Sequence, residues 1–272
     1  MSDAFRPVES VRTDVEIAEW EAAAARRLLD AATYEDRCRV YGEVYDDDNA
    51  FWLARHGRLG IAGACARNHA LIRHACRDHG PVLDIGGGSG VARDALPPDR
   101  TYIVCDASRV AAALPEGASG SIRRVLGYAT ALPIADRSIG AALVLDVLEH
   151  LHEEDIQRCL GECRRVLRPG GHVLIATPNR LSGPWDARSH VRESQTRLGL
   201  HLNELTVRRM LRDLSRHGFR ARSFLMREYQ GRMWSVPPLR LWAGLWETAT
   251  SLAPRRFRAR LCSLAVVLAE AP

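Results

Sequence analysis

Hydrophobic and polar positions follow two different patterns along the chain, and the change falls near residue 81. Before it, apolar residues recur at helical intervals in the alanine-rich stretch 22–32 and again in 61–77. The pair Gly80-Pro81 ends the second segment, as this pair often ends a helix. We therefore predict a helical segment over residues 1–80 that covers part of a larger domain formed by residues 81–272.

From residue 81 onward, short apolar runs alternate with amphipathic stretches. Strands are predicted at 82–85, 102–105, 122–126, 141–145 and 172–176, with helices at 91–96, 108–114 and 153–167. After a long polar connection, a helix is predicted at 207–216 with Thr206 as its N-cap, followed by strands at 219–226 and 261–268. Strands that alternate with helices indicate a doubly wound α/β fold with parallel strands.

The composition adds limits on partners and location. All 38 basic residues are arginine, and they are spread along the chain among 33 acidic residues, so we expect no nucleic-acid partner. The N-terminus lacks the apolar core of a signal peptide, and no apolar run approaches the ~20 residues that cross a bilayer. A cytoplasmic location is the resulting expectation. The seven cysteines lack CxxC spacing, so neither a zinc site nor a disulfide framework is expected, and no metal is predicted.

The first candidate for chemistry is the glycine-rich turn that follows the first predicted strand, residues 86–90. Glycines such as Gly86, Gly88 and Gly90 allow close approach of a ligand to the backbone, and the helix that follows offers free N–H groups. A dinucleotide fingerprint requires glycine at positions one, three and six. Val91 or Arg93 occupies the sixth position here, so that fingerprint fails.

Two acids flank this turn on successive strands. Asp84 precedes the glycines, where a carboxylate can hold an ammonium group directly or through water. Asp106 ends the second strand 20 residues beyond Gly86 (106 − 86), where an acid that binds ribose is expected in nucleotide folds of this type. Capping of turns is the structural alternative for both acids.

These segments, in this order, resemble the motifs of class I S-adenosylmethionine (SAM)-dependent methyltransferases, in particular small-molecule members similar to type 11. The resemblance is carried by residues 82–90, 102–106, 127–133, 145–151 and 166–179. It implies a mostly parallel, seven-stranded, Rossmann-like sheet whose last strand is antiparallel, with SAM as the cofactor. The implied cofactor-binding residues are Asp84, Gly86, Gly88, Gly90, Asp106, Ala107, Ala129, Thr130 and Asp146. One departure is Tyr128, which stands where the family usually carries an acid.

Candidate catalytic residues are His150 and His201. A general base helps methyl transfer only if the acceptor loses a proton during attack, and histidine suits that task near neutral pH. His150 follows the fourth strand, and His201 belongs to the region after the fifth. The competing interpretation of His150 is a hydrogen bond that fixes the local turn. For Asp146, capping of the next helix is a similar alternative.

Candidate substrate-binding residues come from the two flanking regions. Tyr45 belongs to the N-terminal segment, which covers the cofactor in this family. Trp242 and Trp246 belong to an insert, residues 237–260, that lies between the last two strands and has an apolar stripe followed by four arginines. The insert has three interpretations: a cap over a hydrophobic acceptor, a helix in weak contact with an anionic membrane surface, or a helix packed on the edge of the sheet.

The predicted function is SAM-dependent transfer of a methyl group to an O, N or C nucleophile of a small molecule. The apolar insert would suit a hydrophobic acceptor. Two other classes stay open. A Rossmann-type NAD(P)-dependent oxidoreductase would share the sheet, although its fingerprint fails here. A non-catalytic SAM-binding protein would keep the cofactor motifs without an acceptor pocket. The sequence does not indicate the acceptor, the methylated atom or the oligomeric state.

Overall fold

The computed structural model describes residues 14–56, 69–77, 80–114, 122–183, 199–229, 232–236, 243–254 and 264–272. The α-helices are α1 (Asp14–Asp30), α2 (Tyr34–His56), α3 (His69–Ala75), α4 (Arg109–Ala112), α5 (Glu153–Val166), α6 (Val207–Arg216) and α7 (Ala243–Ser251), with short 3-10 helices η2 (Val91–Ala95) and η3 (Leu148–His150). The strands are β1 (Val82–Ile85), β2 (Tyr102–Asp106), β3 (Ile122–Leu126), β4 (Ile139–Leu145), β5 (Leu167–Pro178), β6 (Arg220–Tyr229), β7 (Arg232–Val236) and β8 (Leu264–Glu270).

The strands form one sheet in the order β3-β2-β1-β4-β5-β8-β6-β7. Strands β1 to β5 are parallel to one another, and β8 runs antiparallel between β5 and β6. This confirms the predicted doubly wound, mostly parallel fold with an antiparallel last strand. The sheet has eight strands and not the predicted seven, because the chain turns back after β6 and adds β7 at the edge as a hairpin partner.

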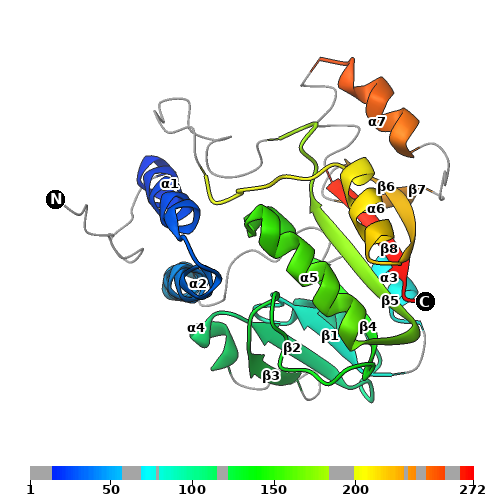
Figure 1. Cartoon of the computed structure of the whole chain (residues 1–272), viewed down its shortest axis with the longest axis horizontal. Coiled ribbons are helices and arrows are strands. Elements are labelled where there is room, and N and C mark those ends of the chain that lie inside the picture. Colours follow the sequence, from blue (N-terminus) through cyan, green and yellow to red (C-terminus); the bar gives the residue numbers. More distant parts are fainter. Residues whose placement is uncertain are drawn as a thin grey trace.

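Helices cover both faces of the sheet, which explains why all four residues of β1 are buried. Leu83 and Ile85 belong to a core shared with α1, α2, α5 and α6. Val82 belongs to a second core, shared with α3 and η2 on the other face. The three helices of the N-terminal region therefore divide: α1 and α2 lie side by side, with α4 next to α2, whereas α3 packs behind the sheet (Figure 1).

The segment after the glycine turn differs from the predicted helix over 91–96. It forms only η2, a 3-10 helix of five residues that begins after Gly90 and ends at Ala95. Leu96 has extended backbone angles, φ −110° and ψ 154°, because it precedes Pro97 and the proline ring disfavours a helical conformation there. At α6 the prediction is confirmed, since the Thr206 side chain accepts a hydrogen bond from the backbone N–H of Arg209.

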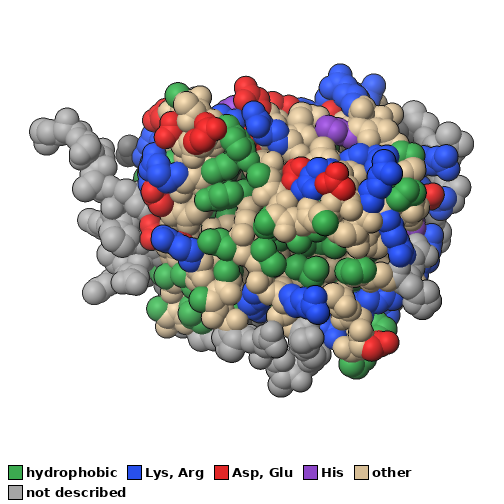
Figure 2. All heavy atoms as spheres, turned by 60° about the horizontal axis from the view of Figure 1, so that its bottom comes forward, with side chains coloured by type: hydrophobic (Ala, Val, Ile, Leu, Met, Phe, Trp, Pro, Cys, Tyr) green, Lys and Arg blue, Asp and Glu red, His purple; other side chains and the backbone are tan. Residues whose placement is uncertain are grey.

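The face drawn in Figure 2 carries both basic and acidic side chains around exposed apolar ones. Among the described residues, no helix is both long enough and apolar enough to span a membrane.

Candidate functional site

A cavity opens at the carboxyl ends of β1, β2 and β4, the edge at which ligands bind in open α/β sheets. The turn after β1, the loops after β2, β3 and β4, and one side of α2 all contribute to its walls. Its lining residues are Tyr41, Tyr45, Asp48, Asn49, Asp84, Gly86, Gly87, Gly88, Ser89, Val91, Cys105, Asp106, Ala107, Gly127, Tyr128, Ala129, Thr130, Leu145, Asp146, Val147, His150 and Leu151. The N-terminal region thus covers the strand ends through α2.

The glycine turn forms the wall nearest β1. Gly86 and Gly88 have φ values of 67° and 50°, a left-handed conformation that favours glycine. A Cβ atom on Gly86 would also lie 2.6 Å from Cγ2 of Val147, so this position has no room for a side chain. Gly86 and Gly88 line the cavity, whereas Gly90 does not: its missing Cβ faces Ile122 of β3, and the residue begins η2.

Asp84 presents a buried carboxyl group beside this turn. Its side chain accepts a hydrogen bond from the hydroxyl of Tyr102 on β2, and only 3% of the residue is exposed. Burial raises the pKa of Asp84 to about 7, and the Tyr102 hydrogen bond opposes that rise. Gly87 packs so closely that an added Cβ would overlap Oδ2 of Asp84. The carboxyl group is therefore held in one position at the cavity wall, where a cationic ligand would favour its charged form.

Asp106 and Arg124 hold the glycine turn from opposite sides. The carboxylate of Asp106 accepts hydrogen bonds from the backbone N–H of Gly88 at 3.0 Å and of Ser108 at 2.9 Å. The Arg124 guanidinium, from β3, donates to the carbonyl oxygens of Gly88 at 2.7 Å and Ser89 at 3.0 Å. The turn is consequently fixed before a ligand arrives, and Asp106 retains acceptor capacity because each carboxylate oxygen has two lone pairs.

The loops after β2 and β3 supply the predicted nucleoside wall. Ala107, Tyr128, Ala129 and Thr130 all line the cavity. The hydroxyl of Thr130 is hydrogen-bonded to that of Tyr34 on α2, with 2.9 Å between the oxygens. Tyr128 occupies the position where an acid was expected, so the side chains of this loop offer an aromatic surface in place of a carboxylate.

Asp146 follows β4 with strained backbone geometry. Its φ is 56°, which is uncommon for a residue other than glycine. Its carboxyl oxygen Oδ2 is buried with no hydrogen-bond partner, and burial raises its pKa to about 6. The alternative role as a helix cap finds no support, because Val147 is the N-cap of η3 and no side chain caps that helix. A strained residue with an unpaired oxygen on a cavity wall suggests a ligand-binding role.

The predicted catalytic histidines lie together, but only His150 lines the cavity. The ring centroids of His150 and His201 are 4.8 Å apart, and the Tyr45 ring stands edge-on to His150 at 5.8 Å. Nδ1 of His150 is 3.2 Å from the carbonyl oxygen of Leu200, and Nδ1 of His201 is 3.2 Å from Oε1 of Glu204. Burial lowers the pKa of His150 to about 3, so its imidazole is neutral near pH 7.

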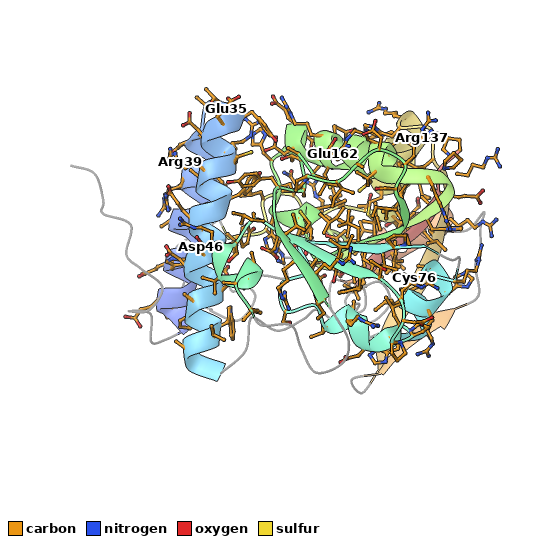
Figure 3. All side chains as sticks on the ribbon, turned by 90° about the horizontal axis from the view of Figure 1, so that it is seen from below. Glu35, Arg39, Asp46, Cys76, Arg137 and Glu162 are labelled. Carbon is orange, nitrogen blue, oxygen red and sulfur yellow. The ribbon has the colours of Figure 1, made fainter. Side chains whose placement is uncertain are left out.

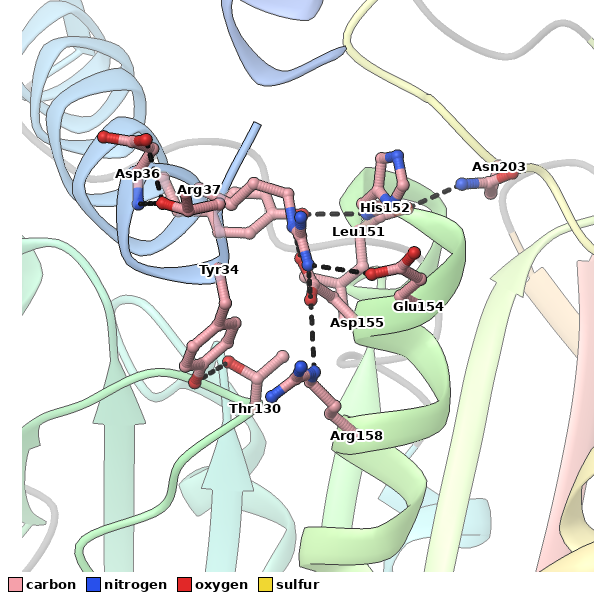
Figure 4. A network of polar contacts seen from close by, with 12 residues as sticks. Tyr34, Asp36, Arg37, Thr130, Leu151, His152, Glu154, Asp155, Arg158 and Asn203 are labelled. Carbon is pink, nitrogen blue, oxygen red and sulfur yellow. Dashed lines mark hydrogen bonds and ion pairs between the residues drawn. The ribbon is translucent and has the colours of Figure 1, made fainter. Parts of the chain in front are cut away.

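The cover helix α2 is fastened to α5 by a buried ion pair (Figure 4). Nε and Nη2 of Arg37 donate to the two carboxylate oxygens of Asp155, at 2.7 and 2.9 Å, and Nη2 also reaches Glu154 at 3.3 Å. The Tyr41 hydroxyl donates to Asp155 at 3.2 Å and accepts from the backbone N–H of His152 at 2.8 Å. These bonds hold the cavity-lining side of α2 against the domain.

Two further contacts fasten α2 at other points. Asp46 points from α2 toward α4 (Figure 3), where its carboxylate accepts hydrogen bonds from Ser108 and Arg109. At the start of α2, the guanidinium of Arg158 lies 4.3 Å from the centre of the Tyr34 ring. The cover is thus attached near its start and in its middle.

The structure does not describe the side chains of the two predicted substrate residues of the insert. Trp242 lies outside the described residues, and so does the side chain of Trp246, although that residue belongs to α7. The described part of α7 packs on α6: the Glu247 carboxylate accepts hydrogen bonds from the first two backbone N–H groups of α6, beginning with Val207 at 2.7 Å. These hydrogen bonds between α7 and α6 support the interpretation that this part of the insert packs on the main domain.

Several residues of the site were not predicted from the sequence. Gly87, Asp48 and Asn49 line the cavity, while Tyr102 and Arg124 hold the lining in place. Gly87 lies inside the predicted ligand-binding turn, so its position alone could have identified it as a site residue. The other four depend on which elements become neighbours in space, and spacing along one strand or helix does not reveal that.

Comparison with known proteins agrees with this geometry. Residues 83–175 match the family model described as a methyltransferase domain. This part of the chain is therefore similar to methyltransferase domains. SAM is the cofactor of such domains, and the buried Asp84 carboxyl, the glycine turn and Asp106 on one cavity wall fit a cationic nucleoside ligand. No comparable support exists for the dinucleotide alternative, whose fingerprint the turn lacks.

Two curated relatives and one solved structure illustrate the range of similar proteins. A probable SAM-dependent methyltransferase of Mycolicibacterium smegmatis is 31% identical over 153 residues, covering 50% of this chain and 57% of that protein. Malonyl-[acyl-carrier protein] O-methyltransferase 1 of Coxiella burnetii is 34% identical over 96 residues, covering 35% of this chain and 33% of its own length. The chain therefore spans between a third and somewhat over half of these relatives.

The fold is shared with phosphoethanolamine N-methyltransferase 2 of Haemonchus contortus, whose structure contains phosphomonomethylethanolamine and S-adenosylhomocysteine. The TM-score is 0.57 at 12% identity, and the alignment covers 86% of this chain and 59% of that one. One similar protein is named for O-methylation and another for N-methylation, so similarity alone does not select the methylated atom.

Proposed function

We propose that the protein transfers a methyl group from SAM to an O, N or C nucleophile of a small molecule. The observation that carries the proposal is the convergence of the glycine turn, Asp84, Asp106 and α2 on one cavity of a methyltransferase domain. When bound, SAM supplies an electrophilic methyl group on a sulfonium, an excellent leaving group. Alignment and exclusion of water can then provide most of the acceleration.

In this proposal the chain's own residues bind and orient. Asp84, once it loses its proton, pairs with the ammonium group of the cofactor, and Asp106 accepts hydrogen bonds from the ribose hydroxyls. Ala107, Ala129 and Thr130 form the surface for the adenosyl portion. Because α2 covers the strand ends, it keeps bulk water from this site.

The acceptor would lie near Asp146, His150 and Tyr45, beyond the end of β4. His150 is neutral, so it can accept a hydrogen bond from an acceptor hydroxyl or amine and orient that group. The nearby side chains of Leu145, Val147 and Leu151 are apolar, which supports an acceptor with a hydrophobic portion. His201 lies behind His150 and would act on the acceptor only through it.

The test has a binding arm and a turnover arm. Calorimetry with SAM and S-adenosylhomocysteine should show binding to the natural chain and its loss in Gly88→Val, which places a branched side chain on the turn. S-adenosylhomocysteine release is then measured with a panel of small phenols, amines and carboxylic acids. A folded chain without affinity for either ligand would contradict the cofactor assignment. Binding without turnover on any acceptor would favour the non-catalytic alternative.

A further inference from the structure

A cluster of metal-ligating groups lies against the wall of the cofactor cavity. Glu149, His150 and His201 each place one ligand-type atom within 4.8 Å of the other two. Glu149 and His150 come from η3, directly after β4, whereas His201 arrives from the chain segment after β5. Residues 51 and 52 positions apart along the chain (201 − 150 and 201 − 149) therefore converge on one point, next to a cavity that His150 itself lines.

Both imidazoles have a hydrogen-bond partner at Nδ1. Nδ1 of His150 lies 3.2 Å from the carbonyl oxygen of Leu200, and that oxygen can only accept, so Nδ1 carries the proton. Nδ1 of His201 is likewise paired with Oε1 of Glu204. In these tautomers each Nε2 carries a lone pair. A carboxylate or carbonyl behind the distal nitrogen is the usual support of histidines that bind metals.

The carboxylates of the cluster have unused, buried oxygens. Glu149 is fully buried, and its Oε2 accepts a hydrogen bond from the Thr177 hydroxyl at 2.9 Å, but Oε1 has no partner. Oδ2 of the neighbouring Asp146 is also buried and unpartnered. Leaving such acceptors unsatisfied away from water is costly, so two of them beside two imidazoles make a site that a cation would stabilise.

We propose that Glu149, His150 and His201 bind a divalent first-row transition metal ion such as Zn²⁺, with Asp146 adjoining it. Two imidazoles and one carboxylate suit such ions, whereas Mg²⁺ and Ca²⁺ prefer sets made of oxygens alone. Ligand atoms about 2.1 Å from zinc lie roughly 3.4 Å apart in a tetrahedron. The three groups therefore need to close by on the order of an ångström. This assignment departs from the sequence, which indicates no metal.

The site would keep at least one coordination position for water or for a ligand oxygen, because only three protein groups are committed to it. His150 lies both in the cluster and on the cavity wall. With an ion bound, its Nε2 is a ligand, so the open coordination position, and no longer the imidazole itself, would face the region proposed for the acceptor. This last step rests on the proposed function. Metal binding itself does not, since it depends only on the three side chains and their supports.

The experiment measures metal binding and cofactor binding separately on the full chain. After treatment with a chelator, the protein is titrated with Zn²⁺ by calorimetry and with Co²⁺ by visible absorption, and S-adenosylhomocysteine affinity is measured in parallel. The natural chain should bind one ion. Glu149→Gln and His201→Ala should bind it at least tenfold more weakly while keeping S-adenosylhomocysteine affinity within threefold. His74→Ala, which removes an exposed histidine of α3, is the control and should bind as the natural chain does.

Three outcomes would overturn the metal site. The first is that the natural chain binds Co²⁺ no more tightly than Glu149→Gln does. The second is that His74→Ala loses as much affinity as the cluster variants, which would make the binding adventitious. For the case in which the buried substitutions unfold the protein, the natural chain is loaded with Cu²⁺, and nitrogen hyperfine structure from two imidazoles is expected in its electron paramagnetic resonance spectrum. Absence of that structure would also exclude the site. Metal binding without S-adenosylhomocysteine binding would instead count against the proposed function alone.

Discussion

Replacement of Arg37 tests whether the cover helix depends on its buried ion pair with Asp155. Arg37 is 5% exposed and Asp155 is fully buried, and two hydrogen bonds join them. Arg37→Met keeps most of the side chain's length and removes the charge. The carboxylate of Asp155 is then left in the interior with the Tyr41 hydroxyl at 3.2 Å and the Arg158 guanidinium at 3.9 Å.

The size of the effect follows from those remaining partners. Removing one member of a buried ion pair costs about 3–5 kcal/mol, because the other charge stays buried without compensation. Arg158 offers partial compensation, which places the expected loss near the lower end, about 3 kcal/mol. For a chain of this size that loss lowers the melting temperature by roughly 6–12 °C. Affinity for S-adenosylhomocysteine should fall as well, since α2 contributes Tyr41 and Tyr45 to the cavity.

The assay combines thermal unfolding with calorimetry on three variants. Arg39→Met is the matched control, because Arg39 lies one half-turn further along the same helix with its side chain 60% exposed, and its melting temperature should match that of the natural chain. The double variant Arg37→Met/Asp155→Leu removes the stranded carboxylate and should recover much of the lost stability. The reasoning is refuted if Arg37→Met melts within 2 °C of the natural chain, or if the double variant is no more stable than the single one.

Three further predictions concern the cofactor cavity. Because burial raises the pKa of Asp84 to about 7, SAM affinity should fall as pH drops below 7, by up to tenfold per pH unit, and calorimetry on Asp84→Asn should show a weak and nearly flat profile. Gly87→Ala should reduce S-adenosylhomocysteine affinity more than tenfold through overlap with Asp84, whereas Gly161→Ala on α5, with only ordinary contacts, should keep that affinity and raise stability by about 0.5–1 kcal/mol. Asp106→Ala should cost about 1.5–3 kcal/mol of binding per lost charged hydrogen bond, and a change in affinity below twofold would assign Asp106 a structural role.

The sequence predicted the fold where local pattern and tertiary packing agree. Strands β1 and β3 and helix α6 have the predicted boundaries, because burial on one or both faces produces the apolar pattern that identifies them. The same reasoning missed β7, whose place depends on pairing with β6 at the sheet edge. It also extended the helix after the glycine turn, where Pro97 ends the helical conformation early.

The sequence predicted those site residues whose position follows from their order along the chain. Gly86, Gly88 and Asp106 follow strands whose carboxyl ends meet, so their order along the chain places them together. Asp46 and Arg37 carry no such signal, because their partners lie 62 and 118 residues away and an amphipathic helix reveals only which side is buried. The approach of His201 to Glu149 likewise depends on the path taken after β5.

The spacing of the contacts made by α2 has a consequence for biosynthesis. Its partners Ser108, Thr130 and Asp155 follow their contact residues by 62, 96 and 118 positions, so α2 is synthesised well before anything it docks on. At about 5–20 residues per second, the delay before Asp155 is made is roughly 6–24 s. For much of that interval the apolar side of α2, including Val44, lacks the completed core that it packs against. The cover helix therefore waits longest for its partners on a nascent chain, which leaves its apolar side open to chaperones or to premature association.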